Sequence, residues 1–428
     1  MKPCADLIVT NISSLLTLSG PERPRSGVEM SNLGIIPNAA MAISGDTVIW
    51  TGPVQKLAGA VDRHSATLTI DAENHAVLPG FVECHTHLVF GGTREDEFAR
   101  KIAGVPYMQI AAEGGGIKRT VRDTRAASEA DLMETGLQRI REALRLGITA
   151  IEIKSGYGLN METERKILTV ARQLAEQTPA TLVTTFLGAH EIPVDRSREE
   201  YLDEVCEKMI PFVAREKLAE FCDVFCEKGV FSLDESERVL TTGIHYGLKP
   251  KIHADQLTPG GGAELASRMH AVSADHLDYT GPAGMKALAD AGVVGVLLPG
   301  AVFFLGLNRF PAARDMIAAN VPIALSTDFN PGSCMSLNIH LMMTIACTRC
   351  RMTIPETLTA VTHNAACAID RQNRLGSLVP GKQADFVILD CPSVETIPYH
   401  FGHNHVKHVF CKGRSIVENG IVLPFQTP

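Results

Sequence analysis

Residues 77–87 read Val-Leu-Pro-Gly-Phe-Val-Glu-Cys-His-Thr-His, so a run of mostly apolar residues is followed at once by two histidines. A short apolar run of this length is consistent with a buried strand, and the polar residues behind it mark the end of that strand. Residues two apart in a strand point to the same face, so His85 and His87 can present two imidazole nitrogens to one ion. The segment therefore predicts a strand that carries half of a metal site at its end.

Seven further apolar runs of strand length follow this one along the chain. The eight predicted strands are residues 77–84, 149–154, 181–187, 223–226, 249–254, 271–274, 293–298 and 322–326. Helical patterns lie between many of them, among them residues 129–146, 161–176, 199–217 and 355–369. Near-continuous apolar strands that alternate with helices are typical of a parallel sheet covered by helices. Eight such units predict an α/β fold of the (β/α)₈ TIM-barrel type, with an open doubly wound sheet as the structural alternative.

The two ends of the chain show short alternating runs separated by Gly, Pro and Asn turns. A small antiparallel unit is predicted for residues 7–10, 40–43, 48–50 and 67–70. The same pattern of short runs and turns is found in residues 385–389, 406–411 and 415–417. We expect the two ends to pair. The predicted organisation is a small β-sandwich domain made of residues 1–75 and 376–428, beside a barrel domain of residues 76–375.

Composition narrows the class of protein. The 428 residues are 45% hydrophobic and 21% charged, which is typical of a globular protein with a large core rather than a disordered chain. The net charge of −8 offers no general attraction for nucleic acid or for anionic lipid. The most apolar window, residues 287–306, contains Asp290 and Pro299 and is interpreted as a buried strand instead of a membrane span. Neither a nucleic-acid partner nor a membrane is expected.

Cysteine usage and the first residues indicate the compartment. Eleven cysteines, an odd number, are scattered through a long chain, which is a poor fit to a secreted disulfide framework. Cys347 and Cys350 have redox-type spacing but no second pair nearby, and we interpret them as structural. Residues 1–6 carry an acid where a signal peptide requires an apolar core. We therefore expect a cytoplasmic protein with reduced thiols.

Polar side chains recur at the carboxyl ends of the predicted strands, where a barrel enzyme places its catalytic groups. Beyond His85 and His87, these strand-end residues are His190, His253, Gln256, His276 and Asp328. His253 and Asp328 would complete a mixed nitrogen and oxygen shell around a divalent ion and leave one position open, as in catalytic sites. An isolated His-x-His pair is more often two histidines that happen to lie on the same face of a sheet. Their position at the end of a strand is what favours a metal site here. The second pair, His403 and His405, lacks such a carboxylate partner and is interpreted as a surface feature.

The segment 79–87 resembles the first-strand signature of the metal-dependent amidohydrolase superfamily. Further segments similar to one branch of that superfamily are residues 85–94, 113–116, 153–158, 186–190, 253–255, 274–276 and 326–333. The resemblance implies hydrolysis of a cyclic amide, with 4-imidazolone-5-propanoate of histidine degradation as substrate and N-formimidoyl-L-glutamate as product. It also implies a single ion, Zn²⁺ or Fe²⁺/Fe³⁺, held by His85, His87, His253 and Asp328, and it is compatible with a homodimer.

The reaction needs a proton acceptor, and the resemblance points to Asp328 for this role. His276 is expected to orient the attacking water or to polarise the carbonyl. Gln256 departs from the superfamily, in which a Glu is often found at this place, and a carboxamide can only position a partner through hydrogen bonds. We therefore assign Gln256 to holding water or substrate.

The substrate-binding residues follow from the same resemblance together with the chemistry of a propionate ligand. The planar fork of Arg94 can bind a carboxylate through paired charge-assisted hydrogen bonds. Tyr107, Tyr157 and His190 are expected to contact the ring. Backbone amides around Asn330, Gly332 and Ser333 are expected to form an anion-binding turn.

Three alternatives stay open at this stage. The metal ligands alone do not determine which cyclic substrate is hydrolysed. The nearest alternative is therefore a hydantoinase-, dihydroorotase- or cytosine-deaminase-like member of the superfamily. A non-catalytic metal-binding barrel is the rival from another class. A phosphate-handling barrel lyase would need a catalytic lysine beside a Gly-rich phosphate site, and residues 330–333 meet only the second condition.

Overall fold

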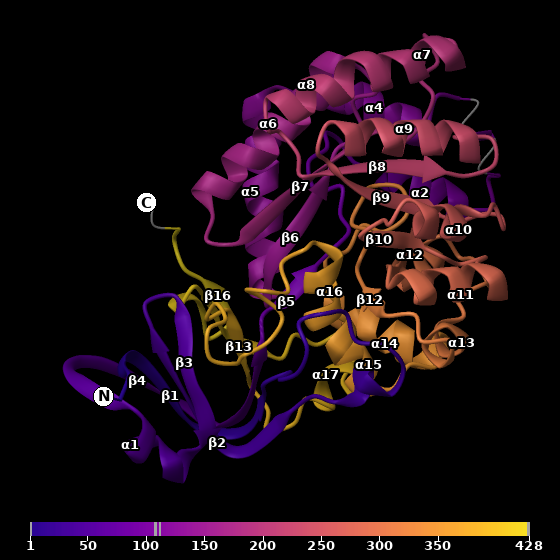
Figure 1. Ribbon diagram of the computed structural model, residues 1–428. Coiled ribbons are helices and arrows are strands. Elements are labelled where there is room, and N and C mark those ends of the chain that lie inside the picture. Colours follow the sequence, from indigo (N-terminus) through magenta and orange to yellow (C-terminus); the bar gives the residue numbers. More distant parts are fainter. Residues whose placement is uncertain (1, 107–108, 111–112, 426–428) are drawn as a thin grey trace.

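The computed structural model describes residues 2–106, 109–110 and 113–425, which contain two eight-stranded sheets (Figure 1). The first sheet is parallel throughout, and its strands follow one another in chain order. They are β5 (Phe81–Glu83), β6 (Ile148–Lys154), β7 (Thr181–Ala189), β8 (Phe221–Cys226), β9 (Lys249–Ala254), β10 (Ser273–His276), β11 (Val294–Leu297) and β12 (Ile323–Leu325). Each predicted run contributes one of these strands, so the barrel prediction is confirmed.

The ring of strands closes just beyond β5 and β12. Thr86 and Phe329 form a parallel bridge there, and the amide of Asp328 donates to the carbonyl of His85 at 3.2 Å. The contact that closes the barrel is therefore made by two predicted metal ligands, His85 and Asp328, and by the residues next to them, and it brings the two ends of the sheet together at the candidate site.

Helices cover the outer face of this sheet, as the alternating pattern predicts (Figure 1). The longer ones begin at capping residues: Ser128 caps α5, and Asn160 caps α6. The predicted helix 199–217 is interrupted by a π-helical turn, Val205–Met209, and the predicted helix 355–369 is divided at Thr362, which leaves the helical region of backbone space. The helices are α1 (Leu57–Ala60), α2 (Glu95–Ile102), α4 (Ile117–Ala126), α5 (Glu129–Arg145), α6 (Met161–Gln177), α7 (Arg198–Glu204), α8 (Ile210–Arg215), α9 (Leu233–His245), α10 (Gly262–Arg268), α11 (Pro282–Ala291), α12 (Pro299–Phe304), α13 (Ala313–Ala318), α14 (Ile339–Arg349), α15 (Ile354–Ala360), α16 (His363–Ala368) and α17 (Thr396–Tyr399).

The second sheet joins the two ends of the chain. Its order is β16-β15-β14-β13-β4-β1-β2-β3, so the indigo and yellow ribbons of Figure 1 belong to one sheet. The strands are β1 (Cys4–Leu16), β2 (Ile35–Ser44), β3 (Thr47–Pro53), β4 (Asp62–Pro79), β13 (Phe386–Leu389), β14 (Val406–Cys411), β15 (Arg414–Glu418) and β16 (Ile421–Val422). The pairing of the chain ends is confirmed, whereas the domain boundaries at residues 75 and 376 stay a prediction.

The expectation of a purely antiparallel N-terminal unit is wrong at one pairing. β1 runs parallel to β4, although it is antiparallel to β2. The reason is topological: after β3 the chain passes through a 3-10 turn, Val54–Lys56, and α1, and it then enters the sheet on the far side of β1. A crossover of this kind returns the chain in the parallel direction.

β4 leads directly into the first barrel strand. Only Gly80 separates the end of β4 from the start of β5, and a Cβ atom at Gly80 would lie 2.2 Å from the hydroxyl oxygen of Thr149. The chain can therefore pass this close to β6 only without a side chain, which explains the Pro-Gly-Phe signature in physical terms. Among the described residues, no helix has both the length and the apolar character needed to cross a bilayer.

Candidate active site

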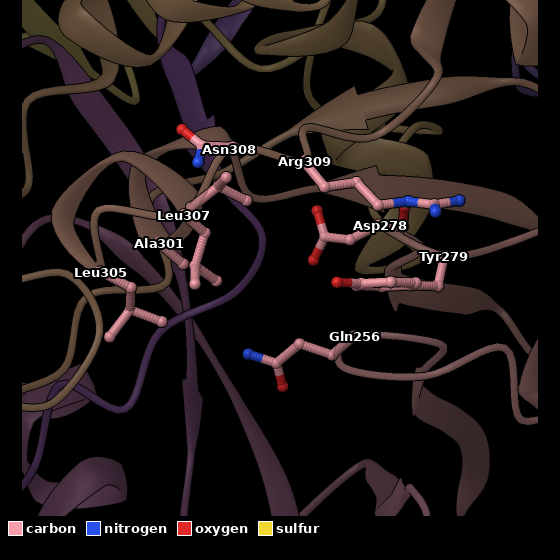
Figure 2. Close-up of a pocket in the computed structure, with 9 residues that line it drawn as sticks. Gln256, Asp278, Tyr279, Ala301, Leu305, Leu307, Asn308 and Arg309 are labelled. Carbon is pink, nitrogen blue, oxygen red and sulfur yellow. The ribbon is translucent and has the colours of Figure 1, made fainter. Parts of the chain in front are cut away.

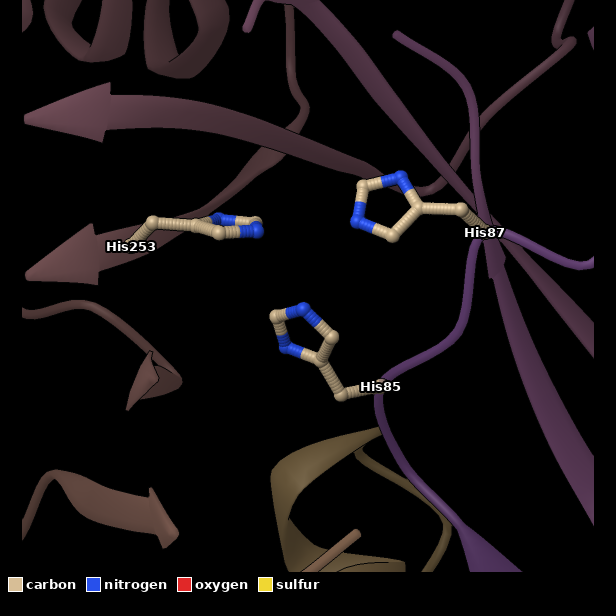
Figure 3. Close-up of side chains that lie close together, drawn as sticks. All are labelled: His85, His87 and His253. Atoms are coloured by element: carbon tan, nitrogen blue, oxygen red, sulfur yellow. The ribbon is translucent and has the colours of Figure 1, made fainter. Parts of the chain in front are cut away.

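Three buried imidazoles converge inside the barrel mouth. His85 and His87 follow β5, and His253 lies in β9; one ligand nitrogen from each lies within 4.8 Å of the others (Figure 3). His85 also forms a second group of this kind with His276, at the end of β10, and Asp328, which follows β12. Every one of these side chains is buried. The structure thus brings together all the predicted metal ligands.

The carboxylate of Asp328 lies against the two histidines of the first strand. Its Oδ1 atom is 3.5 Å from Nε2 of His85 and 3.8 Å from Nε2 of His87. Asp328 and His276 both have a left-handed backbone, with φ of 58° and 78°, which is uncommon for residues other than glycine. Backbone strain of this kind is concentrated at functional sites in proteins.

The imidazoles of His85, His87 and His276 are held in the neutral form that a metal ligand requires. Burial lowers the pKa of His85, His87 and His276 well below the ordinary value, and neighbouring cations and imidazoles add to the effect. Nε2 of His85 and Nε2 of His253 are buried and have no hydrogen-bond partner. A divalent ion bound between these two nitrogens and the nearby carboxylate would satisfy all of them. The residues therefore fit a bound metal.

Carboxylates behind the cluster fix the orientation of two of these rings. Asp275 Oδ2 lies 2.6 Å from Nδ1 of His85, and Asp223 Oδ1 lies 3.1 Å from Nδ1 of His253. With Nδ1 of each ring engaged by a carboxylate, Nε2 is the atom left for an ion. Such outer partners set the tautomer of a ligating histidine and increase its basicity.

Lys154 connects these carboxylates. Its Nζ atom lies 2.7 Å from Asp223, 3.2 Å from Asp275 and 3.2 Å from Glu152, and all four side chains are fully buried. Burial disfavours the ammonium form, but the three carboxylates raise the pKa of Lys154 well above its ordinary value. Lys154 is therefore a fixed positive charge that balances the carboxylates behind the metal ligands.

A cavity of about 440 Å³ opens above the cluster. It contains most of the residues that the sequence analysis assigned to the site. The assigned residues that line it are His87, Arg94, Tyr157, His190, His253, Gln256, His276, Asp328, Asn330, Gly332 and Ser333. His85 lies below this surface, fully buried. Tyr107, assigned to the substrate ring, is outside the described residues.

His190 and Tyr157, which are expected to contact the substrate ring, pack on the side of the cavity that carries the histidine cluster. The imidazole of His190 stacks on that of His87 with centroids 4.9 Å apart, and its Nδ1 contacts the carbonyl of Gly156 at 3.0 Å. Burial lowers the pKa of His190 to about 4. Burial also raises the pKa of the Tyr157 phenol, so this hydroxyl stays protonated and can donate a hydrogen bond.

The turn after β12 differs from the expected anion-binding concavity. The amides of Gly332 and Ser333 donate to Oδ1 of Asn330, at 2.8 and 2.9 Å, and are not free to bind a ligand. An Asn side chain readily closes such a turn on its own backbone, which is the physical reason for the difference. The Ser333 hydroxyl donates to Asp328 Oδ2 at 2.8 Å instead, so this turn holds the carboxylate in place.

The cationic side of the cavity is formed by α2 and the loop before it. Arg94 donates through Nε to Glu97 at 2.9 Å, which leaves the other end of its guanidinium beside Gly332. Lys101 also lines the cavity, and burial, together with the nearby Arg94, lowers its pKa. Lys101 was not predicted as a site residue, although its position two helical turns after Arg94 was a usable signal.

A smaller cavity of about 180 Å³ adjoins the first one and shares Gln256 with it. Figure 2 shows the Gln256 amide directed into this space, opposite Leu305 and Leu307. Arg309 lies over the ring of Tyr279, 4.3 Å from its centroid, and donates to the carbonyl of Asp278 at 3.1 Å. Gln256 therefore stands between the two cavities, at a position suited to hold a water or a polar group of a ligand.

Known proteins similar to this chain share its family and its fold. The model of the amidohydrolase family matches residues 76–416. The chain is 46% identical to the imidazolonepropionase of Alkaliphilus metalliredigens (strain QYMF), which covers 98% of this chain and 99% of that protein. The imidazolonepropionase of Bacillus velezensis is 45% identical over 96% of this chain and 97% of its own length.

Solved structures with the same fold are more distant in sequence. An adenosine deaminase from Xanthomonas campestris with bound zinc has a TM-score of 0.73 at 18% identity and covers 100% of this chain and 96% of its own. A 5-methylcytosine deaminase from Klebsiella pneumoniae has a TM-score of 0.72 at 16% identity, over 96% of this chain and 98% of its own. At these identities the likeness concerns the fold.

Proposed function

The chain belongs to the amidohydrolase family and has the activity of an imidazolonepropionase, and we propose that its buried histidine cluster, Asp328 and Arg94 together carry out this reaction. The reaction hydrolyses the cyclic amide of 4-imidazolone-5-propanoate and yields N-formimidoyl-L-glutamate in histidine degradation. The observation that carries the proposal is the convergence of three buried imidazoles and one carboxylate below a cavity that also presents a guanidinium.

His85, His87, His253 and Asp328 would hold one ion, zinc or iron. Both metals accept imidazole and carboxylate ligands, so the donor set does not choose between them. The chemistry that such an ion supplies is a lower pKa of water, which makes hydroxide available at neutral pH for attack on an amide.

Asp328 is the proposed proton carrier. Its Oδ1 atom faces His85 and His87, and its Oδ2 atom is held by the Ser333 hydroxyl, so the carboxylate is oriented towards the site of attack. Asp328 accepts the proton of the attacking water. It then returns this proton to the ring nitrogen as the carbon–nitrogen bond breaks, a type of transfer that contributes about 10²–10⁴-fold to rate. Burial raises the pKa of Asp328 to about 6.

The remaining residues bind and orient the substrate. Arg94 binds the propionate through its free guanidinium edge, and Tyr157 donates a hydrogen bond to the ring, against which His190 also packs. His276 orients the water or the carbonyl. Gln256 holds a water or a polar ring atom by hydrogen bonds, because an amide cannot transfer the proton.

The direct test is hydrolysis of the substrate by the purified protein. Enzymatically generated 4-imidazolone-5-propanoate is added to metal-loaded protein and to protein stripped with a chelator, and its absorbance is followed. We expect the absorbance to fall with the metal-loaded protein only. Consumption of hydantoin or dihydroorotate, with the imidazolone left intact, would replace the proposed substrate.

The proposed role of Asp328 is tested in the same assay. Asp328→Ala should lower kcat by at least about 10²-fold while the far-UV spectrum stays unchanged. Asp290→Asn is the control, because this exposed carboxylate on α11 pairs with Lys286 on its own helix. Full turnover by Asp328→Ala would remove Asp328 from the mechanism.

A further inference from the structure

A second group of histidine and carboxylate side chains lies where β13 and β14 meet. Asp390 directly follows β13, His405 directly precedes β14, and the amide of Asp390 donates to the carbonyl of His405 at 2.9 Å. Their side chains therefore start from paired positions of one sheet. His403 lies two residues before His405. Asn404, between them, is turned to the barrel, where it donates to the carbonyl of Arg145 at 2.9 Å, so the two histidines share the other side.

The expectation that His403 and His405 are a surface feature without a carboxylate partner is wrong about the partner, although His403 is exposed. Asp390 supplies the carboxylate from a strand end that is 13 residues away from His403 in the sequence, a separation over which spacing gives no signal. His405 is buried, whereas the side chains of His403 and Asp390 are 50% and 41% exposed. The cluster therefore has one fixed imidazole and two groups that solvent can reach.

The donor atoms of the three residues lie close together. Nδ1 of His405 is 2.7 Å from Asp390 Oδ1, and Nε2 of His403 is 3.7 Å from Asp390 Oδ2. One ligand atom from each residue lies within 4.8 Å of the other two. The rings of His403 and His405 have centroids 4.6 Å apart.

The charge balance of this cluster is incomplete. In the described part of the chain, the cationic groups within 4.0 Å of the Asp390 carboxylate are these two imidazoles, with no lysine or arginine. Nε2 of His405 is buried and has no hydrogen-bond partner. A carboxylate without a permanent counter-charge, set between two imidazoles, is a natural ligand set for a cation.

We propose that Asp390, His403 and His405 form a second metal site that takes a divalent ion of the zinc, nickel or copper type. Imidazole nitrogen and carboxylate oxygen together suit these borderline ions better than magnesium or calcium, which prefer oxygen alone. Zinc binds nitrogen at about 2.0–2.1 Å, so three ligands must move to within roughly 3.5 Å of one another. The exposed side chains of His403 and Asp390 can make this movement around the fixed ring of His405.

The ion would link the two ends of the segment that connects β13 to β14, which we call the excursion. Residues 391–404, which include α17, leave the sheet after Asp390 and return at His405. α17 rests on the barrel helix α14, where the Thr344 hydroxyl donates to the carbonyl of Pro398 at 3.0 Å (Figure 1). A metal at the base of this excursion would tie both of its ends together and stabilise the contact between the second sheet and the barrel.

The site is separate from the active site. None of its three residues lines the active-site cavity, and its donors come from the second sheet. The inference therefore does not rest on the proposed function.

Metal content provides the test. The full-length protein is dialysed against buffered micromolar free zinc, and bound zinc per chain is determined by elemental analysis. The parent should bind one zinc ion more than His403→Ala or Asp390→Asn. Loss of an outer partner of a metal site already weakens affinity by about 10–100-fold, so loss of a direct ligand should weaken zinc binding at this site by at least about tenfold. Because the readout is the difference between parent and variant, it does not depend on the ion of the active site.

A matched control is available on the same sheet. His64 pairs with Asp6 at 3.0 Å, and both are exposed, so this is a histidine–carboxylate pair without a second imidazole in its ion-pair contact. His64→Ala should keep the full zinc content. Turnover of the imidazolone should be unchanged in His403→Ala and in His64→Ala.

A spectroscopic measurement tests the ligands themselves. Copper(II), which binds such ligands more tightly than zinc, should displace zinc from this site and give an electron paramagnetic resonance signal with coupling to two imidazole nitrogens, which His403→Ala should reduce to one. Copper at the active-site histidines contributes equally in both proteins, so the difference between the two signals isolates this site. Equal zinc content in the parent and both variants would overturn the proposal, as would a zinc ion lost equally in His64→Ala.

Discussion

Asp275 accepts a hydrogen bond from Nδ1 of His85 at 2.6 Å, at a place in the barrel where neither side chain is exposed. This contact fixes which nitrogen of His85 carries the proton and which faces the cluster. Only one rotation and one tautomer of His85 are then compatible with the buried environment. A carboxylate in β10 therefore orients this ligand for metal binding, and this orientation does not depend on a bound ion.

Asp275→Asn should weaken metal binding without removing a ligand. The amide keeps the shape of the side chain but loses the negative charge that favours the Nδ1–H tautomer, so we expect the dissociation constant for zinc to rise by about 10–100-fold. The measurement is competition for zinc with a chelator. Ser273→Ala is the control, because the Ser273 hydroxyl donates to the other oxygen of Asp275 at 2.6 Å and leaves the bond to His85 intact. An unchanged dissociation constant in Asp275→Asn would show that the contact does not position the ligand.

Lys154→Met should destabilise the protein. Removal of the ammonium leaves Asp223 and Asp275 buried without their lysine partner, while Glu152 keeps Lys251 at 2.9 Å, and loss of one partner of a buried ion pair typically costs about 3–5 kcal/mol. The expected result is a lower midpoint of urea unfolding. Lys154→Met combined with Asp223→Asn should lose less stability than the sum of the single changes, since it removes the carboxylate nearest to the lost ammonium. Additive losses would indicate that the charge balance is unimportant.

Gly332→Ala should impair substrate binding through Arg94. A Cβ atom at Gly332 would lie 2.7 Å from Nη1 of Arg94, so the guanidinium must move. A hydrogen bond to a charged group is worth about 1.5–3 kcal/mol, and partial loss of the propionate contact should raise KM roughly tenfold with little change in kcat. Gly281→Ala is the matched control, because nothing lies within 4 Å of its Cβ position. An unchanged KM in Gly332→Ala would argue against propionate binding by Arg94.

The barrel could be predicted from the sequence because each of its strands is a short apolar run. Burial on both faces of a parallel sheet requires such runs, and all eight appear in the sequence. The predicted run 77–84 also includes the end of β4, which belongs to the second sheet. The strand-end ligands were predictable for the same reason. His253 and Asp328 are 75 residues apart in the sequence, yet a closed barrel brings the carboxyl ends of their strands to one mouth.

The charged layer below the ligands was not predicted. Glu152, Lys154, Asp223 and Asp275 lie within strands and were counted with their apolar neighbours. A signal did exist, because Glu152 and Lys154 are two residues apart, so both point into the barrel. What the sequence could not supply was the pairing, since a lysine and three carboxylates on three strands become neighbours only when the barrel closes.

The two errors at the surface have a similar cause. The parallel pairing of β1 with β4 depends on the side of the sheet on which the chain returns, which residue periodicity does not encode. Asp390 joins His405 through the register of β13 and β14, and no local pattern reveals a register. Sequence periodicity therefore indicates which segments are strands, while contacts between side chains of different strands are seen only in the folded structure.

Asp385 should make stability depend on pH between about 4 and 6. Burial raises the pKa of this carboxyl, which precedes β13, from its ordinary value of 3.8 to about 6, against the opposing effect of hydrogen bonds from Lys412 and Gln383. The folded state therefore binds the proton more tightly than the unfolded state. The stabilisation from the protonated form is complete below about pH 4 and is lost as pH rises through about 6.

Asp385→Asn removes this titration and keeps the shape of the side chain. Groups elsewhere titrate equally in both proteins, so the difference in unfolding free energy between parent and variant isolates Asp385. At about 1.4 kcal/mol per pKa unit, this difference should change by up to ~3 kcal/mol in favour of the variant between about pH 4 and pH 6, and it should be flat above. Urea unfolding of both proteins at half-unit pH steps measures it. A difference that is constant across this range, or that changes in favour of the parent as pH rises, would mean that Asp385 is already ionised without cost in the folded protein.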